Sequence, residues 1–194
     1  MLSLDEIKNL VEDKLLSLGH QDRYSHTLGV VHMAEYLAEI YHIDITKAKT
    51  AAYLHDFCKY DTEEEIKKNL SEKDQEECLK YPVLYHSYGS AVFYRKNVGE
   101  DEDIYQAIRN HVFGRIGMSR LEEIILISDY TEENRTYPNC IHCREILLSG
   151  NLNQAIYEST LLTIEFLKKK NIIPHPLQLE VLKHYEGLCK NDIK

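Results

Sequence analysis

The feature of this sequence that most restricts its fold is the placement of histidines on the apolar faces of separate predicted helices. Residues three, four and seven positions apart share one face of an α-helix. Four such faces contain a histidine: His26 with Val30, Met33 and Leu37; Ala48, Ala51 and Ala52 with His55; His86 with Ser90 and Phe93; and Ile104, Ala107 and Ile108 with His111. We therefore expect a helical core that has to accommodate four imidazole rings.

Helical periodicity runs through nearly the whole chain, and no segment shows the strict alternation that is typical of a half-buried strand. The expected N-caps are Ser3, Thr46, Thr62, Ser71, Asp101 and Ser119. Ser3, Thr62 and Ser119 are each followed three residues later by Glu, which makes a capping box. The longer predicted helices span residues 22–42, 46–57, 83–97, 101–112, 119–131, 140–149, 152–170 and 176–188. The sequence therefore predicts an all-α fold.

Length, charge and cysteine content exclude several classes of protein. The chain has 194 residues, of which 43% are hydrophobic, and fits a single domain over residues 1–194. A net charge of −9 argues against binding to nucleic acid, which needs a basic surface. Because there is no long apolar run and no signal pattern at the N-terminus, we expect neither a membrane association nor secretion. Five cysteines, an odd number, indicate free thiols in a reducing compartment, the cytoplasm.

Two aspartates accompany the histidines. Asp129 shares an inward helix face with Ile125 and Leu126, and Asp56 directly follows His55 at a predicted helix end. A single inward histidine is compatible with an ordinary hydrogen-bonded core residue, but an unpaired buried carboxylate is costly. Four imidazoles and two carboxylates suit two divalent transition-metal ions, and Asp56 is the natural bridge because it has two oxygens. Such mixed ligands accept iron, manganese, nickel, cobalt or zinc.

Seven short motifs surround these residues in a fixed order. They are Arg23-Tyr-Ser-His26-Thr-Leu-Gly-Val, Ala-Tyr-Leu-His55-Asp56-Phe-Cys-Lys59, His86-Ser-Tyr-Gly-Ser-Ala, Ala-Ile-Arg-Asn-His111-Val-Phe-Gly, Gly117-Met-Ser, Ser-Asp129-Tyr and Asn134-Arg135. This series resembles the HD-domain superfamily of metal-dependent phosphohydrolases. Within that superfamily it is most similar to the YqeK-type proteins, the symmetrical diadenosine tetraphosphate hydrolases of Gram-positive bacteria.

The resemblance implies an all-α HD-domain helical bundle with a buried two-metal site, usually described as iron. The core is expected at about residues 20–147, with helices of residues 151–190 packed on it. Carried over by position, the metal ligands are His26, His55, Asp56, His86, His111 and Asp129. The implied substrate is a small nucleotide, diadenosine tetraphosphate, which is cleaved to two ADP by attack of a metal-bound hydroxide on phosphorus. Asp56, Lys59 and Asp129 have the implied catalytic roles.

Four basic residues are candidates for binding the substrate. Lys59, three residues beyond Asp56, is assigned to phosphate binding and to charge stabilisation in the transition state. Arg23 and Arg135 suit further phosphate oxygens, because a guanidinium binds such oxygens in pairs. Arg115 lies in a loop between two glycines that can wrap a nucleotide. The alternative for Lys59, Arg23 and Arg135 is an ordinary surface charge, and the alternative for the loop with Arg115 is a simple connection between helices.

Several other features have more than one interpretation. Tyr24 or Tyr130 is a candidate for stacking on adenine, while most of the 14 tyrosines suit core and rim packing. Cys140 and Cys143 have the spacing of zinc ligands, but no second cysteine pair accompanies them. The apolar stripes of residues 152–188 cover either the core or a second copy of the chain in a homodimer.

The metal site alone does not define the substrate. It also fits another HD-superfamily nucleotide phosphohydrolase, such as a nucleotidase or a phosphodiesterase, or a nucleotide-binding module without catalysis. The chain departs from the pattern of the symmetrical hydrolases at Val112, at Ser128 and in the acidic stretch of residues 131–134. These departures concern substrate contacts and leave the six ligand positions intact.

Overall fold

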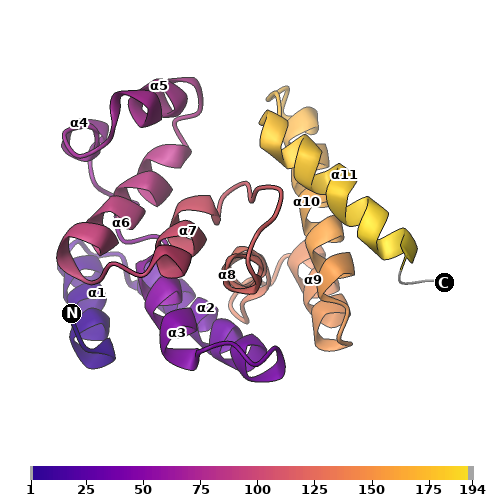
Figure 1. The fold of residues 1–194 in the computed structure, drawn as a ribbon, viewed down its shortest axis with the longest axis horizontal. Coiled ribbons are helices and arrows are strands. Elements are labelled where there is room, and N and C mark those ends of the chain that lie inside the picture. Colours follow the sequence, from indigo (N-terminus) through magenta and orange to yellow (C-terminus); the bar gives the residue numbers. More distant parts are fainter. Residues whose placement is uncertain (1, 192–194) are drawn as a thin grey trace.

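The computed structural model describes residues 2–191, and these form eleven α-helices with no strand among them. The helices are α1 (Leu4–Ser17), α2 (Gln21–Ile40), α3 (Ile45–Leu54), α4 (Glu63–Lys67), α5 (Glu72–Lys80), α6 (Leu84–Asn97), α7 (Glu102–Asn110), α8 (Arg120–Thr131), α9 (Pro138–Leu148), α10 (Leu152–Lys169) and α11 (Pro176–Asn191). Figure 1 shows α8 end-on near the middle, with α2, α3 and α7 on one side and α9, α10 and α11 on the other. The predicted all-α fold is confirmed.

The helix starts follow the predicted capping residues in all but one case. The capping boxes at Ser3, Thr62 and Ser119 are all formed. The exception is α3, where the prediction of Thr46 as the N-cap is wrong, because the side chain of Asp44 accepts a hydrogen bond from the backbone N–H of Lys47. An Asp two residues earlier satisfies the same free N–H groups, so the helix begins sooner.

The end of α3 is also earlier than predicted, at Leu54 instead of residue 57. Beyond it the backbone tightens into turns in which the N–H of Phe57 donates to the carbonyl of Leu54 and the N–H of Lys59 to that of Asp56. Such turns at a helix end satisfy carbonyls that the helix leaves free. They also carry His55 and Asp56 into the centre of the molecule.

Four helices, α2, α3, α7 and α8, pack around that centre, and α6 lies against α7. Ala48, Ala51 and Ala52 of α3 are fully buried, and side chains this small let neighbouring helices approach closely. Branched side chains such as Val30, Ile108, Ile124 and Ile125 fill the remaining core. The apolar faces predicted from periodicity therefore meet in one core that also encloses the predicted ligands.

The C-terminal helices form a second layer. Helix α10 packs against α9 and α11 and also against α8, as Figure 1 shows. Leu152, Ile156 and Ile164, all predicted as part of an apolar stripe, are buried within the chain itself. None of the described helices is long and apolar enough to cross a membrane.

Cys140 and Cys143 lie buried in α9 as thiols that form no disulfide. Burial raises the pKa of the Cys143 thiol to about 12, so it stays protonated at neutral pH. Neither cysteine belongs to a cluster of three or more metal-ligating side chains in residues 2–191. The zinc interpretation of this pair therefore gains no support.

Candidate metal centre

Side chains from five helices and their ends converge in the middle of the core. His26 lies on α2, His86 on α6 and Asp129 on α8, while His55 and His111 are the C-cap residues of α3 and α7. The structure arranges these residues and Asp56 as two groups of three. One group is His26, His55 and Asp129, and the other is Asp56, His86 and His111; within each group the ligand atoms lie within 4.8 Å of one another.

His55 and His111 are held in the same way by the last turn of their helices. The Nδ1 of His55 lies 2.7 Å from the carbonyl oxygen of Ala52, and the Nδ1 of His111 lies 2.7 Å from that of Ile108. A carbonyl oxygen can only accept, so Nδ1 carries the proton in each ring. Each Nε2 is therefore left with a lone pair, and helix geometry aims both lone pairs at the centre. Metal-ligating histidines are typically held by this kind of bond at the other ring nitrogen.

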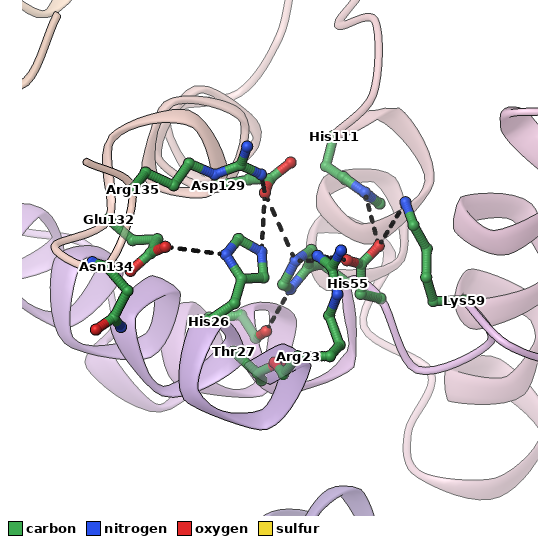
Figure 2. A network of polar contacts seen from close by, with 12 residues as sticks. Arg23, His26, Thr27, His55, Lys59, His111, Asp129, Glu132, Asn134 and Arg135 are labelled. Atoms are coloured by element: carbon green, nitrogen blue, oxygen red, sulfur yellow. Dashed lines mark hydrogen bonds and ion pairs between the residues drawn. The ribbon is translucent and has the colours of Figure 1, made fainter. Parts of the chain in front are cut away.

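His26 is held by a carboxylate instead of a carbonyl. Figure 2 shows its ring between Glu132 and Asp129, with Nδ1 3.1 Å from Glu132 Oε1 and Nε2 3.1 Å from Asp129 Oδ1. Burial opposes a charge on this imidazole, but the two carboxylates outweigh it and raise the pKa of His26. The surroundings of Nε2 thus favour a positive charge, which either a proton or a metal ion supplies.

The carboxylate of Asp56 faces both groups. Its Oδ1 lies 3.1 Å from His86 Nε2 and 3.7 Å from His111 Nε2, and its Oδ2 lies 3.6 Å from His55 Nε2. The side chain is buried, yet the imidazoles around it and Lys59 outweigh the effect of burial and hold the pKa of Asp56 well below its ordinary value. A buried, ionised carboxylate with one oxygen toward each group suits a bridging ligand.

Several polar atoms of this cluster are buried and make no hydrogen bond of good geometry, although other ligand atoms lie close to them. Among them are His26 Nε2, His55 Nε2 and Asp56 Oδ1. Burial lowers the pKa of His55 to about 3, so its ring is neutral and offers a lone pair at Nε2. Leaving such atoms unpaired costs about 1–3 kcal/mol each. A divalent cation satisfies them together, so the residues present fit a metal-binding site.

Three predicted substrate-binding cations lie at the same cluster. Arg23 Nη1 is 2.8 Å from Asp56 Oδ2, and Arg135 Nη2 is 2.8 Å from Asp129 Oδ1. Lys59 Nζ is 3.4 Å from Asp56 Oδ1, and Figure 2 shows its side chain reaching toward the centre. The structure thus brings these three bases beside the predicted ligands.

Arg115 does not join the other three bases. Its Nε and Nη2 each donate to the carboxylate of Glu122, at 2.7 Å, and Glu122 also accepts from the backbone N–H of Ser119. Arg115 therefore secures the loop in front of α8. The assignment of Arg115 to substrate binding stays a prediction without a contact that favours it.

Glu132, the residue that holds His26, was missed by sequence reasoning. It is the C-cap of α8, only 1% exposed, and its Oε2 accepts from the backbone N–H of Asn134 at 2.6 Å. Glu132 lies just past the helix, where periodicity no longer indicates which face a side chain occupies. Nothing in the sequence distinguished it from Glu133, which is exposed.

Gly29 provides the space for Glu132. A Cβ at position 29 would lie 2.1 Å from Glu132 Oε2 and 2.9 Å from Asn134 Nδ2. No side chain fits at that distance unless Glu132 moves away from His26. Gly29 therefore leaves the space in which Glu132 can orient the imidazole of His26.

We expect the substitution Gly29→Ala to weaken metal binding about 10- to 100-fold, because it displaces the carboxylate that orients His26. Overpacking should also lower the free energy of unfolding by about 1–3 kcal/mol. The matched control is Gly187→Ala in α11, where the added Cβ meets no atom within 4 Å. That variant should be about 0.5–1 kcal/mol more stable and bind metal normally. Calorimetric titration of metal and denaturant unfolding measure the two effects, and unchanged metal affinity in Gly29→Ala would contradict this role.

The chain is similar to known proteins over most of its length. The family model of the HD domain matches residues 23–138. The symmetrical bis(5'-nucleosyl)-tetraphosphatase of Halalkalibacterium halodurans is 41% identical over 171 residues, which cover 87% of this chain and 89% of that protein. The proteins of the same name from Bacillus subtilis and Staphylococcus aureus are 41% and 32% identical, over 78% and 95% of this chain and 82% and 95% of their own lengths.

A solved structure is similar over nearly the whole chain. It is the crystal structure of a predicted HD superfamily hydrolase involved in NAD metabolism from Clostridium acetobutylicum. Its sequence is 31% identical, and the match covers 96% of this chain and 98% of the other, with a TM-score of 0.85. The C-terminal helices α9, α10 and α11 are therefore part of the shared architecture, because the match extends well beyond residue 138.

Proposed function

This chain belongs to the HD-domain family, and on that premise we propose that it is a metal-dependent hydrolase that cleaves diadenosine tetraphosphate symmetrically into two molecules of ADP. The relatives that match most of its length carry the name symmetrical bis(5'-nucleosyl)-tetraphosphatase. The observation that carries the proposal is a cluster of buried ligand atoms that make no hydrogen bond of good geometry, although they crowd together: His26 Nε2, His55 Nε2 and Asp56 Oδ1. A core of this kind is costly unless cations complete it.

The two groups of side chains would hold two divalent transition-metal ions. His26, His55 and Asp129 would bind one, and Asp56, His86 and His111 the other, with Asp56 shared between them. We infer iron as the native metal from the family resemblance, while the mixed imidazole and carboxylate set also accepts manganese, nickel, cobalt or zinc. When bound, such ions neutralise charge on phosphate oxygens and activate the attacking water.

The basic residues at the cluster would bind the polyphosphate. Lys59 and Arg23 lie beside Asp56, and Arg135 lies beside Asp129, so positive charge is present at both groups of ligands. A tetraphosphate chain that crosses the centre meets a cation at each side of the bond to be broken. Guanidinium and ammonium donors fixed in this way stabilise the charge that develops on phosphate oxygens during in-line transfer.

The reaction products test the proposal most directly. We expect the purified protein, supplied with ferrous or manganous ion, to convert diadenosine tetraphosphate into ADP as the sole product, as identified by chromatography. AMP together with ATP would contradict symmetrical cleavage and the placement of Lys59, Arg23 and Arg135 around the central phosphates. If diadenosine tetraphosphate is left intact while a nucleoside monophosphate or cyclic nucleotide is hydrolysed, the metal chemistry stands and the substrate assignment is wrong.

We place the enzyme in the cytoplasm. Cys58, Cys78, Cys140 and Cys143 are all buried thiols without disulfides, a state that a reducing compartment maintains. A small, highly charged nucleotide as substrate also agrees with that compartment.

A further inference from the structure

A cavity of about 480 Å³ opens beside the metal centre. It shares His26, Arg23 and Arg135 with that centre, and Tyr60 and Tyr137 also line it. Two aromatic rings thus share one cavity with the cations that face the phosphate-binding region. Neither ring has a role in the hydrolysis proposed above.

The ring of Tyr60 is fixed in position by a neighbouring aromatic side chain. The ring of His20 stacks on it, with the ring centroids 3.4 Å apart and the planes inclined by 11°. Tyr60 lines the cavity and His20 does not, so the histidine supports the ring from outside the cavity. Tyr60 nevertheless remains 43% exposed, which leaves part of its ring surface available to a ligand.

Tyr137 is set in place by its position at the start of α9. It is the N-cap residue and precedes Pro138, which restricts the backbone of the residue before it to extended conformations. Tyr137 is 70% exposed, so much of its ring surface is available to a ligand. Aromatic rings with free faces next to a phosphate-binding region are the parts from which nucleotide sites are built.

We propose that this cavity holds one purine nucleoside of the substrate, with its base stacked on the Tyr60–His20 pair and covered by Tyr137. The proposal rests on the proposed function, since the metal centre has to act on the phosphate chain attached to that nucleoside. Arg23 and Arg135 line the cavity and also pair with carboxylates of the metal centre, so they would bind the phosphates that follow the ribose. Tyr60 would then favour substrates that carry a base over bare polyphosphates.

Tyr24 and Tyr130, which the sequence suggested for stacking on adenine, are less suitable for that role than Tyr60. Tyr24 is buried and donates its hydroxyl hydrogen to Glu12 at 2.8 Å, so its ring is part of the core. Tyr130 lines a much smaller cavity, of about 70 Å³, on the Asp129 side. Both cavities border predicted ligands, but the cavity at Tyr60 is the larger of the two and is also lined by Arg23 and Arg135.

The test compares binding of two probes to the metal-loaded protein by calorimetric titration: ADP, which has a base, and inorganic pyrophosphate, which has none. We expect Tyr60→Ala to weaken ADP binding about tenfold, because stacking on one aromatic ring accounts for about that factor. Pyrophosphate affinity should be unchanged. Tyr60→Phe should retain ADP affinity, and His20→Ala should lower it by a smaller factor. The matched control is Tyr36→Ala, since Tyr36 is also 43% exposed but lies on α2 outside this cavity.

Two results would overturn the subsite. One is ADP affinity that does not change in Tyr60→Ala, and the other is an equal loss for ADP and pyrophosphate, which would make Tyr60 a support of the metal centre. The product assay keeps the two proposals apart. If the wild-type protein leaves diadenosine tetraphosphate intact but binds ADP in a Tyr60-dependent way, the subsite stands and the proposed substrate is wrong.

Discussion

Replacing Asp56 by alanine should abolish hydrolysis of diadenosine tetraphosphate, with a fall in rate of about a thousandfold or more. Asp56 is the only one of the six candidate ligands with an oxygen toward each group: Oδ2 is 3.6 Å from His55 Nε2 and Oδ1 is 3.1 Å from His86 Nε2. Its loss removes a negative charge that faces three imidazoles, those of His55, His86 and His111, so both ions would lose a ligand. Elemental analysis of the purified variant should find less metal per chain than in the wild type, in parallel with the loss of activity.

A matched control separates the loss of a ligand from the loss of a buried ion pair. Asp74 is also largely buried and pairs with Arg109 at 2.5 Å, but it lies on α5 away from the centre. Asp74→Ala should lower the free energy of unfolding while metal content per chain and the catalytic rate stay close to wild type. Full activity of Asp56→Ala would refute the metal assignment, and loss of metal in Asp74→Ala would show that metal content merely follows stability.

Removing the metal from the wild-type protein should have the second large effect. We expect a chelator to abolish activity and to lower the melting temperature by about 5–10 °C relative to protein with one ion at a hundred times its dissociation constant. The physical reason is that the ion would bind only the folded cluster, where His26 Nε2, His55 Nε2 and Asp56 Oδ1 are buried without a hydrogen bond of good geometry. Differential scanning calorimetry with and without chelator measures the shift.

Adding metal back to the chelated protein provides the control. Ferrous or manganous ion should restore both the melting temperature and the activity of the wild type, whereas Asp56→Ala should show little metal-dependent shift. A melting temperature that is insensitive to the chelator, in a protein that still hydrolyses its substrate, would mean that the buried cluster is satisfied without metal and that the site is misassigned.

Helical periodicity was enough to predict the fold class and to place the candidate ligands on faces that turn inward. His26, His86 and Asp129 lie on helix faces that also carry apolar side chains, and such faces have to turn inward because exposing them to water is unfavourable. His55 and His111 end apolar stripes of the same kind, so their inward direction was also contained in the local pattern. Capping residues such as Ser119 signalled helix starts because they satisfy free N–H groups locally.

Only the tertiary structure decided which side chains face one another. Periodicity defines the side of a helix but not what lies opposite, so the pairing of Arg23 with Asp56 and of Arg115 with Glu122 could not be predicted. Helical periodicity also predicts the direction of a side chain only within a helix. Glu132, which orients His26, lies just past α8.

The residues that the sequence alone left undefined therefore share one physical property. Glu132, Tyr60 and Tyr137 lie outside regular helix interiors, where no periodic hydrogen-bond pattern relates a position in the chain to a direction in space. Their directions depend on contacts with distant residues, such as Glu132 with Gly29 and Tyr60 with His20. The sequence by itself determined the helices and the residue types available to the candidate metal centre, because helices follow from local patterns and ligand chemistry from residue type. The tertiary structure decided how the side chains of that centre are oriented and which cavity lies beside them, because both depend on packing between distant segments of the chain.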